Sequence, residues 1–146
     1  MITRRSISIA LALSLTALLV ISVATASAQP AFTARIALTG AAEAPGPGDP
    51  DATGQAKILL VPANGLVCWQ LSWADIDGTV TAAHIHGPAA VGVPAGVLVP
   101  LSVDPAKGCI RADAELVATI AGDPTNYYVN IHSTVFPAGA VRGQLD

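Results

Sequence analysis

The chain has 146 residues, of which 52% are hydrophobic and only 12% are charged, and its formal net charge is −3 at pH 7. Its seven Lys and Arg residues form no basic patch that the sequence reveals, which argues against nucleic acid as a partner. The length is typical of a single domain that can bury a hydrophobic core.

The first 28 residues predict an export signal that is not part of the fold. Residues 1–5 contain Arg4 and Arg5, residues 6–23 carry no charge, and residues 26–28 are the small residues Ala-Ser-Ala that a signal peptidase reads. We place cleavage after Ala28, with Ala26 as the second choice. An uncleaved membrane anchor is the alternative, because about 18 apolar residues just span a bilayer.

Cleavage would leave residues 29–146 as one domain of 118 residues. The loss of Arg4 and Arg5 would leave five basic and ten acidic residues, a formal net charge of −5. No second apolar span follows the signal. We therefore expect a protein outside the cytoplasm, either secreted or periplasmic.

Residues 31–101 of the sequence predict a series of short strands. Apolar residues alternate with others in most of these segments, which is typical of half-buried strands. Residues 39–53 are rich in Gly and Pro and predict a loop, and Asn64-Gly65 predicts a tight turn. The predicted strands cover residues 31–38, 54–61, 66–73, 79–86 and 97–101.

The last third of the chain predicts one short helix and two more strands. Asp113 can cap a helix over residues 113–120, and Gly122-Asp123-Pro124 would end it. Strands are expected at residues 127–133 and 140–145, after a return of the chain near residues 107–110. Seven short strands with Gly/Pro-rich connections favour an all-β fold, a Greek-key β-sandwich with one short helix before the penultimate strand.

Two cysteines, Cys68 and Cys109, both lie in the exported part of the chain. A disulfide is expected there, since such bonds persist outside the cytoplasm. On the chain-entropy model, closing this loop would stabilise the fold by about 4 kcal/mol. Thiolate metal ligands are the alternative, but the sequence contains no C-x-x-C motif.

The three histidines of the chain fall on two predicted strands. Side chains alternate between the faces of a strand, so His84 and His86 point together while Ile85 points the other way. The same rule separates His132 from Ile131. If both isoleucines face one core and the strands are neighbours, all three histidines lie on the same outer face.

Several motifs resemble a CHRD domain, the module named after chordin. The resemblance covers nearly all of residues 29–146 and implies a β-sandwich related to copper/zinc superoxide dismutases, with no well-defined activity. The motifs are Gly40–Glu43, Cys68–Leu71, Ala83–Gly87, Tyr128–Ser133 and Gly139–Leu145.

The similarity to dismutases implies copper ligands at His84, His86 and His132. A bridged copper–zinc pair needs further histidines that this sequence does not contain, so activity of that type is not expected. Asn130 lies two residues from His132 on the same face and is expected to help orient the ligands from a second shell. Arg142 is on the last strand, where dismutases keep a substrate-steering arginine; otherwise it is a surface charge paired with an aspartate.

We therefore hypothesise a non-enzymatic exported binding module with one metal ion at His84, His86 and His132. Copper is the first choice and zinc the second, because three imidazoles suit both. A metal-free module that binds an extracellular protein is one alternative, and a copper redox enzyme is another. No arrangement of catalytic residues is recognisable in the sequence.

Overall fold

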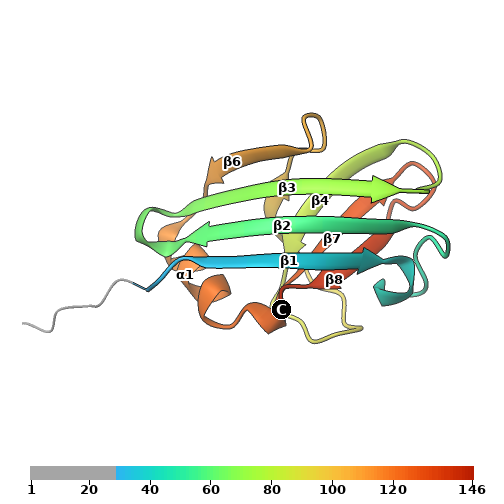
Figure 1. Cartoon of the computed structure of the whole chain (residues 1–146). Coiled ribbons are helices and arrows are strands. Elements are labelled where there is room, and N and C mark those ends of the chain that lie inside the picture. The colour runs from blue at the N-terminus through green and yellow to red at the C-terminus, as the bar shows by residue number, and fades with distance from the viewer. Residues whose placement is uncertain (1–28) are drawn as a thin grey trace, which may run out of the picture.

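The structure is a computed structural model that describes residues 29–146. Eight strands form one antiparallel sheet that curls on itself, in the order β5-β4-β7-β8-β1-β2-β3-β6 (Figure 1). The strands are β1 (Phe32–Thr39), β2 (Thr53–Val61), β3 (Leu66–Ala74), β4 (Val80–His86), β5 (Val97–Leu101), β6 (Lys107–Arg111), β7 (Tyr128–Ser133) and β8 (Val141–Gln144).

The core lies inside the curl, where alternate residues of the strands point inward. Ile58, Val67 and Ile131, from three different strands, are fully buried, while their sequence neighbours lie on the opposite face of the sheet. Trp69 packs among these residues and donates its indole N–H to the carbonyl oxygen of Ser102 at 3.0 Å. The inner face of the sheet is therefore apolar, and any polar site must lie on its outer face.

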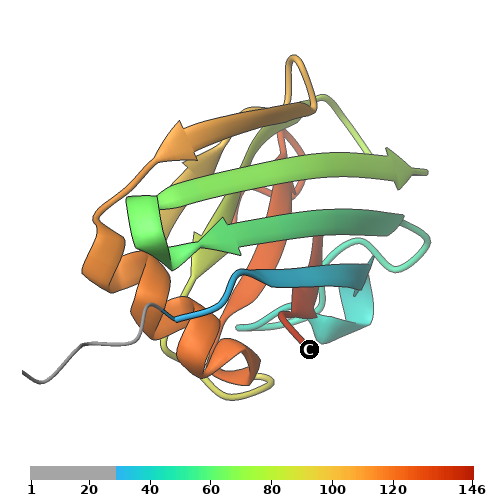
Figure 2. The same cartoon turned by 60° about the vertical axis from the view of Figure 1, so that its left-hand side comes forward.

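One α-helix, α1 (Ala114–Gly122), lies across one end of the curled sheet, beside the β2–β3 connection (Figure 2). The Asp113 carboxylate caps it by accepting a hydrogen bond from the Leu116 N–H at 3.0 Å. Val117 and Ile120 are fully buried, so the helix closes this end of the core. Three 3-10 turns, Gly40–Ala42, Pro62–Asn64 and Pro124–Asn126, complete the regular structure of the described chain.

The expected all-β fold is confirmed, as are the helix before the penultimate strand and the turn that contains Asn64 and Gly65. The structure has eight strands where the sequence predicts seven. The additional one is β6, which pairs with β3. Its Lys-Gly-Cys-Ile-Arg sequence lacks the apolar alternation of a strand. The Greek-key and dismutase-like topology stays a prediction.

The disulfide between Cys68 and Cys109 is confirmed, and it joins two directly paired residues of β3 and β6. The expected signal segment, residues 1–28, lies outside the described residues. Across residues 29–146, no helix has the length and apolar character that a membrane crossing needs.

Candidate metal centre

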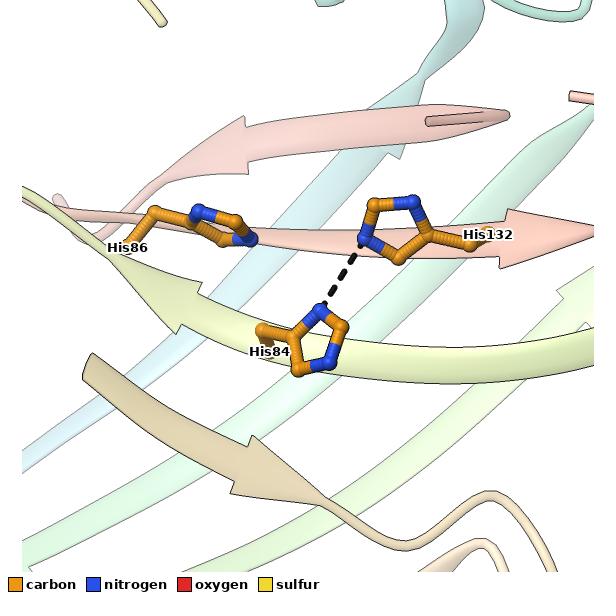
Figure 3. A group of neighbouring side chains, drawn as sticks. All are labelled: His84, His86 and His132. Carbon is orange, nitrogen blue, oxygen red and sulfur yellow. Dashed lines mark hydrogen bonds between the residues drawn. The ribbon is translucent and has the colours of Figure 1, made fainter. Parts of the chain in front are cut away.

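The three histidines come together on the outer face of the two neighbouring strands β4 and β7. Ile85 and Ile131 are fully buried, and this fixes which face the flanking histidines occupy. One ligand nitrogen from each of His84, His86 and His132 lies within 4.8 Å of the other two. Figure 3 shows the three rings gathered around one point. The shared face expected from side-chain alternation is confirmed.

His86 is the most buried of the three, with 6% of its surface exposed. Its Nδ1 lies 2.9 Å from the carbonyl oxygen of Ala95. A carbonyl oxygen only accepts hydrogen bonds, so Nδ1 of the neutral ring carries the proton and Nε2 carries a lone pair. This Nε2 is buried and has no hydrogen-bond partner. An unpaired buried acceptor is costly, so this nitrogen lacks a partner that the described side chains and backbone do not supply.

His132 is oriented in the same way by a different loop. Its Nδ1 lies 3.1 Å from the carbonyl oxygen of Pro137 and donates to it, so the lone pair again falls on Nε2. That Nε2 lies 3.0 Å from Nδ1 of His84. Without a metal, the His84 Nδ1 proton bridges the two rings. With that proton removed, the lone pairs of His84 Nδ1, His86 Nε2 and His132 Nε2 all point into one space.

The surroundings of the site favour neutral rings. Burial, together with the neighbouring His132 and His86, lowers the pKa of His84 from 6.5 to about 4. Burial also lowers the pKa of His132, against the opposing effect of the Pro137 carbonyl. Neutral imidazole is the form that binds metals, so both shifts favour metal binding by His84 and His132.

Tyr128 and Arg142 support the site from the same side of the sheet. The ring of Tyr128 stacks on His86, with centroids 4.9 Å apart and planes within 3°. The guanidinium carbon of Arg142 lies 3.4 Å from the centroid of the Tyr128 ring. The Tyr128 hydroxyl accepts a hydrogen bond from the Ala95 N–H at 3.0 Å. His86 and its supporting aromatic ring are therefore both held by the backbone of Ala95.

The loop that carries Ala95 is fastened to the sheet by β8. Arg142 donates to the carbonyl oxygens of Val93 at 3.0 Å and Ala90 at 3.2 Å. The Gln144 amide donates to the carbonyl oxygen of Ala89 at 2.7 Å. Residues 89–95 thus form a loop over this face, which we call the covering loop, and it holds the acceptor of the His86 proton in place.

The structure contradicts one of the two interpretations of Arg142, the surface charge, and shows the surroundings of Asn130. Arg142 is 1% exposed and bonds to carbonyl oxygens, so it is not a surface charge paired with an aspartate. Asn130 is 2% exposed and lies directly opposite His84 and Arg142 on the neighbouring strands. Its side chain helps to lower the pKa of Glu43, its Oδ1 is buried without a hydrogen-bond partner, and within the described residues no hydrogen bond joins it to a histidine ring. Backbone carbonyls of two loops orient the rings of His86 and His132.

Glu43 is a member of this region that reasoning from the sequence missed. Burial raises the pKa of its carboxyl group to about 7, against the opposing effects of Arg142 and Asn130. Its Oε1 is buried without a hydrogen-bond partner. It lies in the predicted loop between β1 and β2, and only the folded chain brings it to Asn130.

Chemically, the cluster offers three imidazole nitrogens and an open side. Nitrogens bound to one tetrahedral metal at about 2.0–2.1 Å lie about 3.3 Å from each other. The 3.0 Å separation of His84 Nδ1 and His132 Nε2 is already close to this value. Because the ligand atoms of all three histidines lie within 4.8 Å of one another, the His86 ring would need to move by only about 1.5 Å to complete the set. The residues present therefore fit a single copper or zinc ion, with water in the remaining position.

Comparison with known proteins identifies the family of this chain but no individual relative. The family model described as the CHRD domain matches residues 34–145. No curated protein and no solved structure shows a significant match.

Proposed function

Because this chain belongs to the CHRD domain family, we propose that it is a binding module that holds one metal ion at His84, His86 and His132, with copper preferred to zinc. The module has no catalytic role in this proposal. The three histidines occupy the positions that the resemblance to dismutases implies for copper. These are all three histidines of the chain, so no histidine remains to bind a second metal ion, which supports a mononuclear site.

The observation that carries the proposal is the buried Nε2 of His86, which has no partner and lies beside the His84–His132 pair. Two backbone carbonyls fix the tautomers of His86 and His132 so that their lone pairs face the same space. A metal ion would satisfy the orphaned nitrogen and replace the proton shared by the other two rings. A surface patch of histidines would not need this orientation.

The preference for copper rests on ligand type. Imidazole suits both copper and zinc, and Cu(II) binds a given set of nitrogen ligands more tightly than zinc does. The disulfide, whose cysteines are not buried, supports an oxidising compartment, and with it the export that residues 1–28 predict. In such a compartment the module would carry, buffer or be stabilised by the metal.

The test is titration of residues 29–146 with Cu(II), and separately with Zn(II), against a competing chelator. We expect one equivalent to bind, with Cu(II) the tighter, and a loss of about 100-fold or more in His84→Ala, His86→Ala or His132→Ala. Asp104→Asn, which removes an exposed carboxylate from the turn before β6, is the control and should bind as the wild type does. Circular dichroism of each variant confirms that it is folded.

Equal and weak binding by the wild type and the histidine variants would reject the metal site. The metal-free alternative, a module for an extracellular protein, would then take its place. If one equivalent binds, mixing the copper-loaded protein with superoxide or peroxide separates a binding module from a redox enzyme. We expect no catalytic turnover.

A further inference from the structure

The charges of the described chain are sorted between loops and strands. All ten Asp and Glu residues lie outside the strands, in loops, turns or α1. Four of the five Lys and Arg residues in residues 29–146 are exposed on strands, namely Arg35, Lys57, Lys107 and Arg111. The fifth is the buried Arg142. The exposed surface of these strands is therefore positively charged, although the net charge of the molecule is negative.

Strand register places three of these cations in one row. Arg35 of β1 lies directly opposite Lys57 of β2, Lys57 lies opposite Gln70 of β3, and Gln70 lies opposite Lys107 of β6. Neighbouring strands are about 4.8 Å apart, so the row runs about 14 Å across the sheet. Arg111 lies farther along β6, on the same face as Lys107. Figure 1 shows these four strands side by side. We call this surface the cationic face.

The cationic face is unfavourable to the isolated protein. Arg35 and Lys57 are a directly opposed pair of like charges, an arrangement that destabilises a sheet. No Asp or Glu lies on β1, β2, β3 or β6 to offset it. A ligand that carries negative charge would remove this repulsion.

A shallow hollow of about 330 Å³ lies in the same surface. Five of its eight lining residues have polar side chains, namely Arg35, Lys57, Gln55, Gln70 and Ser72, and the others are Ile36, Ala37 and Ala56. Amides and hydroxyls both donate and accept, so they match hydroxyl groups on a ligand, while the two cations match its negative charges. The lining therefore suits a molecule with both kinds of group.

We propose that the cationic face binds an acidic polysaccharide, whose carboxylate or sulfate groups contact Arg35, Lys57 and Lys107 and whose hydroxyls contact Gln55, Gln70 and Ser72. The outward residues of these four strands include no Phe, Tyr or Trp, so the stacking platform on which single-stranded nucleic acid binding relies is missing from this surface. This proposal does not depend on the metal site, which lies on other strands.

The disulfide has a definite place in this surface. Cys68 and Cys109 face outward between Lys107 and Arg111, and they tie the edge strand β6 to β3. Two of the four cations are on β6. The disulfide thus holds part of the cationic face in register with the rest.

The experiment measures binding of residues 29–146 to heparin, which is sulfated, and to polygalacturonate, which carries carboxylates, with neutral dextran and duplex DNA as comparisons. We expect binding to at least one acidic polysaccharide, none to dextran, and weaker binding to DNA. Raising the NaCl concentration from 50 to 200 mM should weaken it strongly, because binding releases counterions. The two acidic ligands show whether sulfate or carboxylate is preferred.

The decisive variant is Arg35→Gln/Lys57→Gln, which should lose at least tenfold in affinity for the acidic polysaccharide. Ala114→Glu/Thr119→Glu changes the net charge by the same amount at exposed positions of α1 and should lose less than twofold. Equal losses in both double variants would show an effect of overall charge alone and overturn the proposal. Binding that favours DNA, or no binding to either acidic polysaccharide, would overturn it as well.

Discussion

The two outer surfaces of this sheet present polar groups in opposite ways. On β4, β7 and β8 the polar side chains are largely buried under loops, and backbone carbonyls fix their orientation. On β1, β2, β3 and β6 the cations are exposed, and their mutual repulsion is not offset. The first surface is preorganised for a small ligand that needs fixed geometry, and the second suits a long, flexible and charged one.

The difference follows from what covers each surface. The covering loop, residues 89–95, consists mainly of small residues and lies close enough to the sheet to accept hydrogen bonds from Arg142 and Gln144. No comparable contact from a loop to the exposed cations of β1 and β2 is present in the described residues. The same sheet can therefore carry both a rigid site and an open binding surface.

Breaking the disulfide should have the largest effect on stability and should separate the two surfaces. Cys68→Ala/Cys109→Ala is expected to lower the free energy of unfolding by about 2–4 kcal/mol, because the unfolded chain gains the freedom of an open loop. Polysaccharide binding should weaken, since β6 is released, while Cu(II) affinity stays within about threefold. Urea denaturation and the two titrations measure these effects; a large loss of Cu(II) affinity would show that the two surfaces are coupled.

Arg142→Met should damage the histidine surface selectively. The variant leaves two carbonyl oxygens of the covering loop without their donor and removes the cation over Tyr128. We expect a loss of about 2–3 kcal/mol in the free energy of unfolding. Metal affinity should fall about 10- to 100-fold, as is usual when groups that orient ligands are removed. Chelator competition measures the affinity, and binding unchanged from the wild type would show that the loop does not position His86.

The metal-free protein should become less stable as the pH falls, in part because of His84. The pKa of His84 is about 4 in the folded protein and 6.5 in the unfolded chain. Between pH 4 and pH 6.5 the unfolded chain therefore binds this proton more readily than the folded protein does. The contribution of His84 is therefore complete above pH 6.5 and is lost as the pH falls to 4. His84→Gln should flatten the dependence. Urea denaturation at pH 7, 5.5 and 4.5 tests this, and parallel curves for the two proteins would contradict it.

The smallest effect is expected on the cationic face, and it should be a gain in stability. Lys57→Glu replaces a like-charged pair with an opposite-charged pair opposite Arg35, which should raise the free energy of unfolding by about 0.5 kcal/mol. The same variant should lose affinity for acidic polysaccharides. Salt should reduce the stability gain. A loss of stability at low salt would mean that the repulsion is already relieved within the fold.

The gathering of the histidines was predictable because it depends on local geometry. Side chains alternate along every strand, and the apolar Ile85 and Ile131 show which side faces the core. The helix was predictable for a similar reason, since Asp113 caps it and two apolar residues one turn apart face inward. In each case neighbours in the sequence determine the result.

The supporting groups were not predictable, because they depend on contacts between distant segments. The carbonyls of Ala95 and Pro137 carry no side-chain signal, although they fix two of the histidine rings. Glu43 is a loop residue until the fold brings it to Asn130. The burial of Arg142 depends on a loop of small residues that sequence patterns describe only as irregular.

The cationic face was not predictable from the sequence either. Arg35, Lys57 and Lys107 are far apart in the sequence and form no basic run, so the sequence shows no basic patch. Only the register of four strands brings them into a row. Strand β6 itself was missed, because its glycine and its charged ends mask the pattern of a strand.

The most direct test of the metal site is electron paramagnetic resonance of residues 29–146 loaded with one equivalent of Cu(II), beside His86→Ala. We expect a single type of copper with hyperfine splitting from three nitrogens in the wild type, and the loss of that signal in the variant. A wild-type spectrum without nitrogen splitting, or one that His86→Ala leaves unchanged, would contradict it.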